Sequence, residues 1–279
     1  MSATSRSGQR SVYPPPNQIL SALGIEVSHR SVDGDPALLA RMTADLGLLG
    51  RDGRPPGVGA LVPLVDLAAG VQITTQAEGD WLVTSDLWIN ERAPLAAGPL
   101  ELTATLVRLG RRTGVSLIEV VAGDRGIASA TVEFTRVHRD GVSPGTTRAT
   151  DAWSRLGSGP LLDRPLEQAC GFRVVAPGSG QVEVPNSPFV ANSTGTLQGG
   201  VGALVADAAA ADLIGPEART VDLSYRFLAP VGDGPTLASA ELVRVDGAGA
   251  KAHHVVRVEV LDVSVDRLVG LATAGVLAG

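Results

Sequence analysis

Two stretches of the chain are apolar on nearly every side and long enough to form buried helices. They are residues 57–72 (GVGALVPLVDLAAGVQ) and residues 199–214, and Gly215-Pro216 ends the second. Runs typical of strands, separated by glycine and proline, follow each stretch. These runs are residues 81–92, 100–109, 115–121 and 127–137, and then 219–228, 237–245, 253–263 and 268–277. The pattern predicts an α+β protein in which each half has one buried helix and a mostly antiparallel sheet.

The remaining segments set the domain limits. Residues 172–176 and 181–184 are strand-like, whereas residues 19–45 show no clear period and residues 51–56 predict a loop. The Ser, Arg and Pro content of the start predicts a loose tail. Gly, Ser, Pro and Asp in residues 139–166 predict a linker. We therefore expect a tail at 1–18, a first domain at 19–138, the linker, and a second domain at 167–279.

The two halves also share sequence. Residues 84–94 read TSDLWINERAP and residues 220–230 read TVDLSYRFLAP, an offset of 220 − 84 = 136. Further on, Asp124-Arg125 matches Asp266-Arg267 at an offset of 142. This period is far longer than the unit of a solenoid, so the repeat indicates two copies of one domain.

Composition narrows the class of protein. The net charge of −6 argues against a nucleic-acid binder, whose affinity would come from a basic face. A lone cysteine excludes an internal disulfide and a cysteine-built zinc site, and we expect no histidine metal site because His253 and His254 point to opposite faces of a strand. Since the chain has no apolar run of roughly 18–20 residues and no secretory signal at its start, we predict a cytoplasmic protein without a membrane span.

Each predicted helix carries one carboxylate among apolar neighbours. These are Asp66 in PLVDLAAG and Asp207 in LVADAAAAD. A buried, ionised carboxylate must be solvated, paired or shifted to a higher pKa. Such an acid either bonds a backbone group at a domain interface or marks a functional site.

A polar loop leads into the second helix. It reads Asn192-Ser-Thr-Gly-Thr-Leu-Gln198-Gly199-Gly200. Glycines at a helix start let the free backbone N–H groups approach a ligand, and the helix dipole favours a developing negative charge there. This arrangement suits an oxyanion hole, with a nearby carboxylate as general base or nucleophile. The plainer alternative is that Gly-Gly only begins a tightly packed helix.

The spacing Asn192-x5-Gln198-Gly199-Gly200-x6-Asp207, followed by Thr220-Val-Asp, resembles the hotdog-fold acyl-CoA thioesterases of the phenylacetate-operon type. Their pattern is Asn-x5-His-Gly-Gly-x6-Asp, so Gln198 stands where the family usually has histidine. The resemblance implies a tandem, double hotdog with two antiparallel sheets, each wrapped around a central helix. It also implies that asparagine and Gly-Gly of one copy polarise the thioester carbonyl, while aspartate and Ser/Thr of the other activate water.

Aligning Asp66 with Asp207 places Gly57, Val58 and Gly59 at the positions of Gln198, Gly199 and Gly200, and Arg51 at Asn192. We therefore expect one complete site, with Asn192, Gln198 and Gly199 from the second copy facing Asp66 and Thr84 from the first. The opposite site, with Asp207 and Thr220, should be weak. If Asp207 instead dominates, its donors must come from first-copy backbone that this alignment misplaces.

The expected activity is hydrolysis of acyl-CoA to free acid and coenzyme A, with no cofactor beyond the coenzyme A of the substrate. Gly200 would contact the ligand, and Arg111 and Arg112 would either meet the phosphates of coenzyme A or form a solvated hairpin tip. The alternatives are a non-catalytic acyl-CoA-binding or regulatory protein, a hotdog hydratase or dehydratase, and a purely structural dimerisation module. As in the family, double hotdogs would pair into homo-oligomers.

Overall fold

The structure is a computed structural model that describes residues 17–32, 34–45, 47–49, 56–77, 80–137, 156, 160–249 and 252–279. Nearly all of the predicted tail, residues 51–55 of the predicted loop with Arg51, and most of the predicted linker lie outside the described residues. Within the described part, no helix is long and apolar enough to span a membrane.

The described residues of the first half form two short helical elements, one long helix and six strands. They are α1 (Ile19–Ala22), β1 (Glu26–Val32), β2 (Asp35–Ala44), η1 (Val58–Leu61), α2 (Val62–Thr74), β3 (Trp81–Glu91), β4 (Gly98–Leu109), β5 (Thr113–Ala122) and β6 (Arg125–Val137). The predicted helix at 57–72 therefore begins as a 3₁₀ turn and continues as α2. Pro63 lies in the first turn of α2, where a missing N–H costs little.

The second half repeats the long helix and its four following strands. Its elements are α4 (Leu166–Ala169), β7 (Arg173–Val174), β8 (Gln181–Val184), α5 (Gly199–Ile214), β9 (Arg219–Phe227), β10 (Thr236–Asp246), β11 (His253–Asp262) and β12 (Arg267–Leu277). The predicted helix at 199–214 has the bounds of α5, because Gln198 caps its start and Gly215 leaves the helical conformation at its end.

The strands form one sheet, where the sequence predicted two. Its order is β1-β2-β4-β5-β6-β3-β9-β12-β11-β10-β8-β7, and every pair is antiparallel. The halves join where β3 pairs with β9, in a register from Asp86 opposite Arg226 to Asn90 opposite Asp222. Each of these strands would otherwise leave an edge of unpaired backbone groups, and their pairing satisfies both edges at once.

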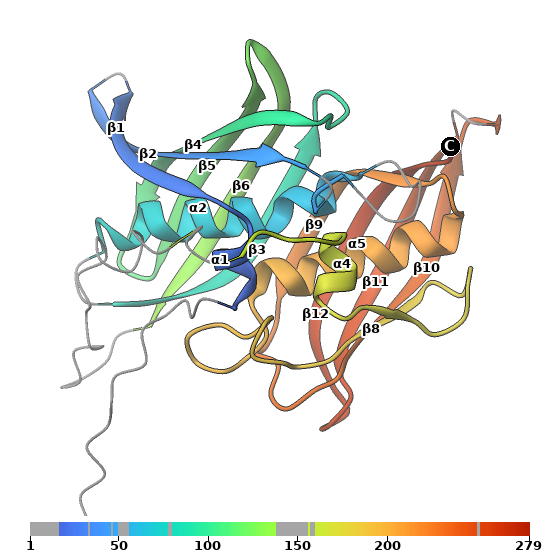
Figure 1. Ribbon diagram of the computed structural model, residues 1–279. Coiled ribbons are helices and arrows are strands. Elements are labelled where there is room, and N and C mark those ends of the chain that lie inside the picture. Colours follow the sequence, from blue (N-terminus) through green and yellow to red (C-terminus); the bar gives the residue numbers. More distant parts are fainter. Residues whose placement is uncertain are drawn as a thin grey trace, which may run out of the picture.

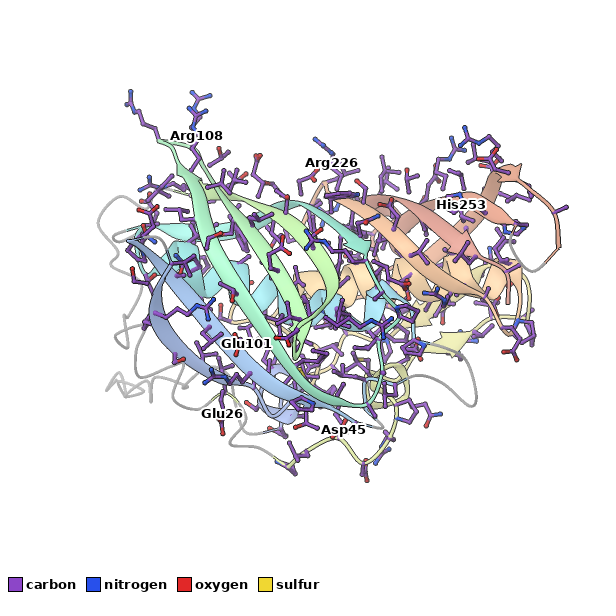
Figure 2. The ribbon with its side chains drawn as sticks, turned by 90° about the horizontal axis from the view of Figure 1, so that it is seen from above. Glu26, Asp45, Glu101, Arg108, Arg226 and His253 are labelled. Atoms are coloured by element: carbon purple, nitrogen blue, oxygen red, sulfur yellow. The ribbon has the colours of Figure 1, made fainter. Side chains whose placement is uncertain are left out.

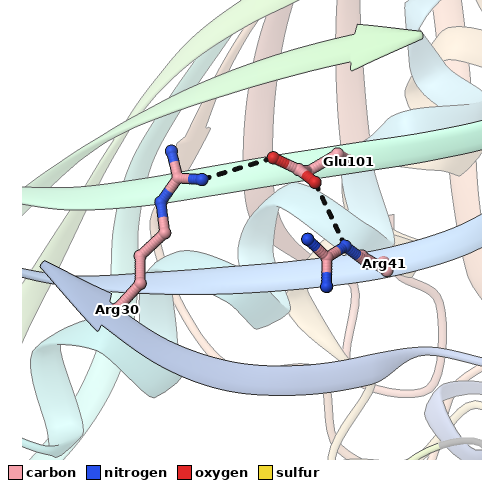
Figure 3. Close-up of polar contacts among 3 residues, drawn as sticks. All are labelled: Arg30, Arg41 and Glu101. Atoms are coloured by element: carbon pink, nitrogen blue, oxygen red, sulfur yellow. Dashed lines mark hydrogen bonds and ion pairs between the residues drawn. The ribbon is translucent and has the colours of Figure 1, made fainter. Parts of the chain in front are cut away.

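Two strands in residues 19–45, β1 and β2, have no counterpart in the prediction. Four consecutive residues of β2, Ala37–Ala40, are buried, which removes the alternation that identifies a strand in sequence. Glu101 of β4 accepts from Arg30 of β1 at 3.4 Å and from Arg41 of β2 at 3.1 Å (Figure 3). These exposed ion pairs add little stability, so buried aliphatic side chains hold this edge of the sheet in place.

Both long helices lie on the same face of the sheet (Figure 1). α2 packs against β2 to β6, and α5 packs against β8 to β12, while the two helices also contact each other. Every side chain of α5 from Gly200 to Asp212 is buried, as the unbroken apolar sequence predicts. The helix contact brings the start of α5 against the start of α2, and this is where the candidate site lies.

β-bulges occur at matching places in the two halves. In β3 the register shifts between Thr84 and Asp86, and in β9 it shifts between Thr220 and Asp222, so both bulges keep the offset of 136. The bulge in β4 after Leu106 likewise matches the bulge in β10 after Leu242. Because bulges re-aim side chains and increase strand twist, their positions describe local geometry that the two halves share.

Candidate active site

Asp66 accepts three hydrogen bonds that come from both halves of the chain. Its Oδ1 accepts from Thr84 Oγ1 at 2.8 Å. Its Oδ2 accepts from Gln198 Nε2 at 2.7 Å and from the Gly200 backbone N–H at 3.2 Å. The carboxyl lies in the second turn of α2 and is 7% exposed. Residues that are 132 positions apart in sequence thus meet at one buried carboxylate.

Gln198 reaches Asp66 because it also caps α5. Its Oε1 accepts from the Val201 N–H at 2.9 Å, which turns Nε2 of the same amide toward Asp66. The side chain is 5% exposed. The amide oxygen of Gln198 therefore caps the first turn of α5, and its amide nitrogen binds the carboxylate.

The glycine pair lets the two helices approach closely. A Cβ atom at Gly200 would lie 2.5 Å from Pro63 Cα, and one at Gly199 would lie 3.1 Å from Asp66 Oδ2. Neither distance accommodates a side chain without movement of its neighbours. Gly-Gly at the start of α5 is thus required by packing, and it also places backbone N–H groups beside the carboxyl.

Burial raises the pKa of Asp66 from its usual 3.8 to about 6. The hydrogen bonds from Thr84, Gly200 and Gln198 oppose this rise, because they stabilise the ionised form. All three donors are uncharged. A carboxyl with a pKa near 6 is mostly ionised at neutral pH and can still take up a proton, as a general base requires.

Some hydrogen-bonding positions of the site are not used by the described residues. A carboxylate has about four acceptor positions, and the described residues use three of them. Among the hydrogen bonds of the described residues, none uses the N–H of Gly199, one of the first-turn amides that a helix leaves unpaired. Gln198 Nε2 carries a second N–H as well. One acceptor position for water and two donors for an oxyanion therefore lie within one small region.

Asn192 is engaged within its own loop. Its Oδ1 accepts from the Thr194 and Thr196 N–H groups at 2.9 and 3.1 Å, and its Nδ2 donates to Thr196 Oγ1 at 2.7 Å. Every hydrogen bond recorded for its side chain lies between residues 192 and 197. The structure thus places Asn192 as the organiser of the loop before α5, and it records no contact of Asn192 with Asp66.

The corresponding region around Asp207 differs in its partners. Gly57 stands where Gln198 stands in the other half, and a Cβ atom there would lie 2.9 Å from the Thr220 N atom, so the β9 backbone excludes any side chain at that position. Thr220 Oγ1 is buried and forms no hydrogen bond with the described residues, whereas Thr84 bonds Asp66. The half-sites have therefore diverged in their polar contacts.

A small cavity of about 40 Å³ lies beside Asp207. It is lined in part by Gly57, Ala60, Leu204, Asp207, Ala208 and Thr220. Its volume is enough for water.

Arg111 and Arg112 lie in the turn between β4 and β5, where both are exposed. A Cβ atom on nearby Gly114 would lie 2.9 Å from Cγ2 of Ile73, near the end of α2. Asp66 is seven residues earlier in that helix, about 10 Å along its axis. Arg108 at the same hairpin points outward, away from the helices (Figure 2). The structure thus places these arginines at the far end of α2 from the polar cluster.

Phe227 is a neighbour of the site that the sequence did not identify. Its Cε1 would lie 3.4 Å from a Cβ atom on Gly199, and its ring centroid is 4.5 Å from that of Tyr225. The two-residue period of β9 puts both rings on one face, which was the available signal. Phe227 therefore places an aromatic ring beside Gly199, with the ring of Tyr225 packed against it.

In the described residues, no group of three or more His, Cys, Asp or Glu side chains is arranged to hold a metal ion. The lone cysteine, Cys170, is buried, and burial raises the pKa of its thiol far above the usual value. It therefore adds no reactive group to the site.

Part of the chain matches a known protein family, and its fold matches solved structures. Residues 58–129, which include Asp66 and Thr84, match the Thioesterase superfamily family model. A protein of unknown function with a hotdog fold from Alicyclobacillus acidocaldarius superposes with a TM-score of 0.53 at 17% identity, covering 93% of this chain and 97% of the other. The chain has the hotdog fold.

Two further solved structures match along nearly the whole chain. A candidate thioesterase II from Thermobifida fusca has a TM-score of 0.56 at 17% identity, covering 95% of this chain and 98% of its own. The tesB protein of Mycobacterium avium subs. paratuberculosis has a TM-score of 0.55 at 14% identity, covering 93% and 97%. Among the curated proteins, no sequence matches significantly. At such identities the likeness establishes the hotdog fold only.

Proposed function

We propose that the protein is an acyl-CoA thioesterase with one complete site, built from Asp66 and Thr84 of the first half and Gln198 and Gly199 of the second. The observation that carries the proposal is the buried Asp66 carboxyl, whose pKa is about 6 and whose partners come from both halves. The thioesterase superfamily match over residues 58–129 supports this class of reaction. The matching bulges and offsets support an origin by duplication of one hotdog domain.

In the proposed reaction, ionised Asp66 accepts a proton from water while the water oxygen attacks the thioester carbon. The carbonyl oxygen becomes an oxyanion that the Gly199 N–H and the second N–H of Gln198 Nε2 stabilise. Collapse of the tetrahedral intermediate breaks the C–S bond, and Asp66 returns its proton to the departing sulfur. The products are a free acid and coenzyme A, and Asp66 is ionised again.

Thr84 keeps the carboxylate oriented during this cycle. Its hydroxyl donates to Oδ1 and so occupies one acceptor position of the carboxylate. The other donors and the water molecule bind at the remaining acceptor positions. Phe227 beside Gly199 offers an apolar surface to the acyl group, and the ring of buried Tyr225 packs behind it. Arg111 and Arg112 stay a proposal for the phosphates of coenzyme A, which would have to extend along α2. The cytoplasmic location, the domain limits and further pairing of double hotdogs stay predictions.

Thiol release from a panel of acyl-CoA substrates of different chain length tests the proposal. We expect turnover with at least one member, and Gln198→Ala should lower kcat by roughly 100- to 1,000-fold, as loss of an oxyanion donor does elsewhere. Gln181→Ala, which changes a glutamine in β8, is the matched control and should keep full activity. Tight binding of acyl-CoA without turnover would favour a non-catalytic binding protein and would contradict the proposal.

A further inference from the structure

The loop that leads to Gln198 is held by residues at the start of the described chain, Gln18 and Ile19. Three successive loop carbonyls each accept one hydrogen bond. The pairs are Ile19 N–H to Phe189 O at 2.9 Å, Gln198 N–H to Val190 O at 2.9 Å, and Gln18 Nε2 to Ala191 O at 3.1 Å. The backbone of the loop is thereby fixed between the start of the described chain and the start of α5.

Gln18 is completely buried, and both ends of its amide are engaged. Its Oε1 accepts from the Leu20 N–H at 2.7 Å, which caps α1, while its Nε2 donates to Ala191 O. Because the first contact fixes the direction of the second, the amide is a rigid link between α1 and the loop. Loss of the link would leave a partly buried carbonyl without its donor, which is costly.

We propose that Gln18 is a positioning residue for the active site: it holds the loop at Ala191 so that Gln198 keeps its contact with Asp66. The inference rests on the proposed function, since Gln18 itself contacts neither Asp66 nor the reacting atoms. Val190 is the direct mechanical connection, because its carbonyl accepts from the backbone of Gln198. A shift of the loop moves the backbone from which the Gln198 amide projects.

The chemistry requires this precision. Misplacement of a reacting group by about 1 Å can lower a rate by roughly 100-fold. Gln198 has to satisfy Val201, Asp66 and the proposed oxyanion together, so it has no freedom to compensate for a displaced backbone. Gln18, which lies outside both predicted hotdog domains, thus helps to position Gln198.

The test compares Gln18→Met, which keeps the length of the side chain, and Gln18→Ala in the full chain. The matched control is Gln72→Ala, because Gln72 is also buried and its Nε2 also donates to a carbonyl, that of Pro36 at 2.7 Å. We expect both Gln18 variants to lose roughly 10- to 100-fold in kcat with KM nearly unchanged. The acidic limb of kcat/KM should move to higher pH, because the Gln198 hydrogen bond lowers the pKa of Asp66.

Thermal unfolding of all three variants separates positioning from stability. Gln72→Ala should lose stability comparably but keep kcat and the pH limb. Unchanged kcat and an unchanged limb in folded Gln18→Met would overturn the proposal. A carbon-13 NMR titration of Asp66 gives the same readout without turnover: its pKa should rise in the Gln18 variants. If the native protein hydrolyses nothing, the proposed function fails, whereas the NMR result still decides whether Gln18 positions Gln198.

Discussion

Replacing Asp66 by asparagine should abolish hydrolysis and at the same time stabilise the protein at neutral and alkaline pH. The pKa of the carboxyl is raised from 3.8 to about 6, so the folded state binds its proton more tightly than the unfolded state. The stability contribution of the group is therefore greatest at low pH and falls as the pH rises from about 4 to about 6. At 1.36 kcal/mol per pKa unit, the loss is about 3 kcal/mol above pH 6.

Asparagine at position 66 avoids this loss because it does not ionise. With its oxygen toward Gln198 and Gly200, its amide N–H can donate to Thr84, whose hydroxyl rotates to accept. Asp66→Asn should thus be more stable than the native protein by up to about 3 kcal/mol at pH 8, and by little below pH 4. Such a gain in stability with loss of activity is expected where an active site is strained.

Urea unfolding at pH 4.5 and 8, together with thiol release from acyl-CoA, measures both effects. Asp207→Asn is the control, because Asp207 occupies the same position on the other long helix and is equally buried. It should keep most of the activity. The reasoning is refuted if Asp207→Asn abolishes hydrolysis and Asp66→Asn does not, or if Asp66→Asn shows the same stability difference at both pH values.

Three further outcomes follow from the same site. In the native protein kcat/KM should fall to half near pH 6 as Asp66 takes up its proton, and a limb near pH 4 would mean that a different acid acts. Thr84→Val should lower kcat at least roughly tenfold, because it removes a hydrogen bond to Asp66. Thr220→Val removes a buried hydroxyl without a partner among the described residues, so it should keep activity and stabilise the protein by about 1 kcal/mol. Equal losses of kcat in the two variants would contradict this. Gly200→Ala should destabilise by roughly 1–3 kcal/mol in urea unfolding, because the new Cβ meets Pro63 Cα at 2.5 Å, and an unchanged midpoint would show that the helices can separate.

The sequence by itself determined the elements whose pattern is local. The unbroken apolar run before Gly215-Pro216 predicted the bounds of α5, and alternation predicted the four strands after each long helix to within two or three residues. The offsets of 136 and 142 also predicted which positions of the two halves correspond. The bounds of the helix and strands follow from side-chain period and turn chemistry, which act over a few residues, whereas the offsets come from comparing the two halves.

Alignment of the halves also led to the expectation that Asp66 and Thr84 face Gln198 and Gly199. The structure brings these four residues together. It gives Asn192 a different setting, because two residues of its own loop, Thr194 and Thr196, bond its side chain. A motif names the residue types, whereas the hydrogen bonds that each one makes depend on the competing groups around it.

Only the tertiary structure decided the contacts between distant segments. Two edge strands, β3 and β9, merge the two expected sheets into one, because each satisfies the other's unpaired backbone groups. The close approach of β9 to Gly57 excludes a side chain there, so only the other half can have a glutamine cap that reaches an acid. Burial then raises the pKa of Asp66, and Gln18 binds the loop before α5, which is 173 residues later in the sequence. None of these contacts is encoded by a local period, since each arises where the packed core brings remote backbone within hydrogen-bonding distance.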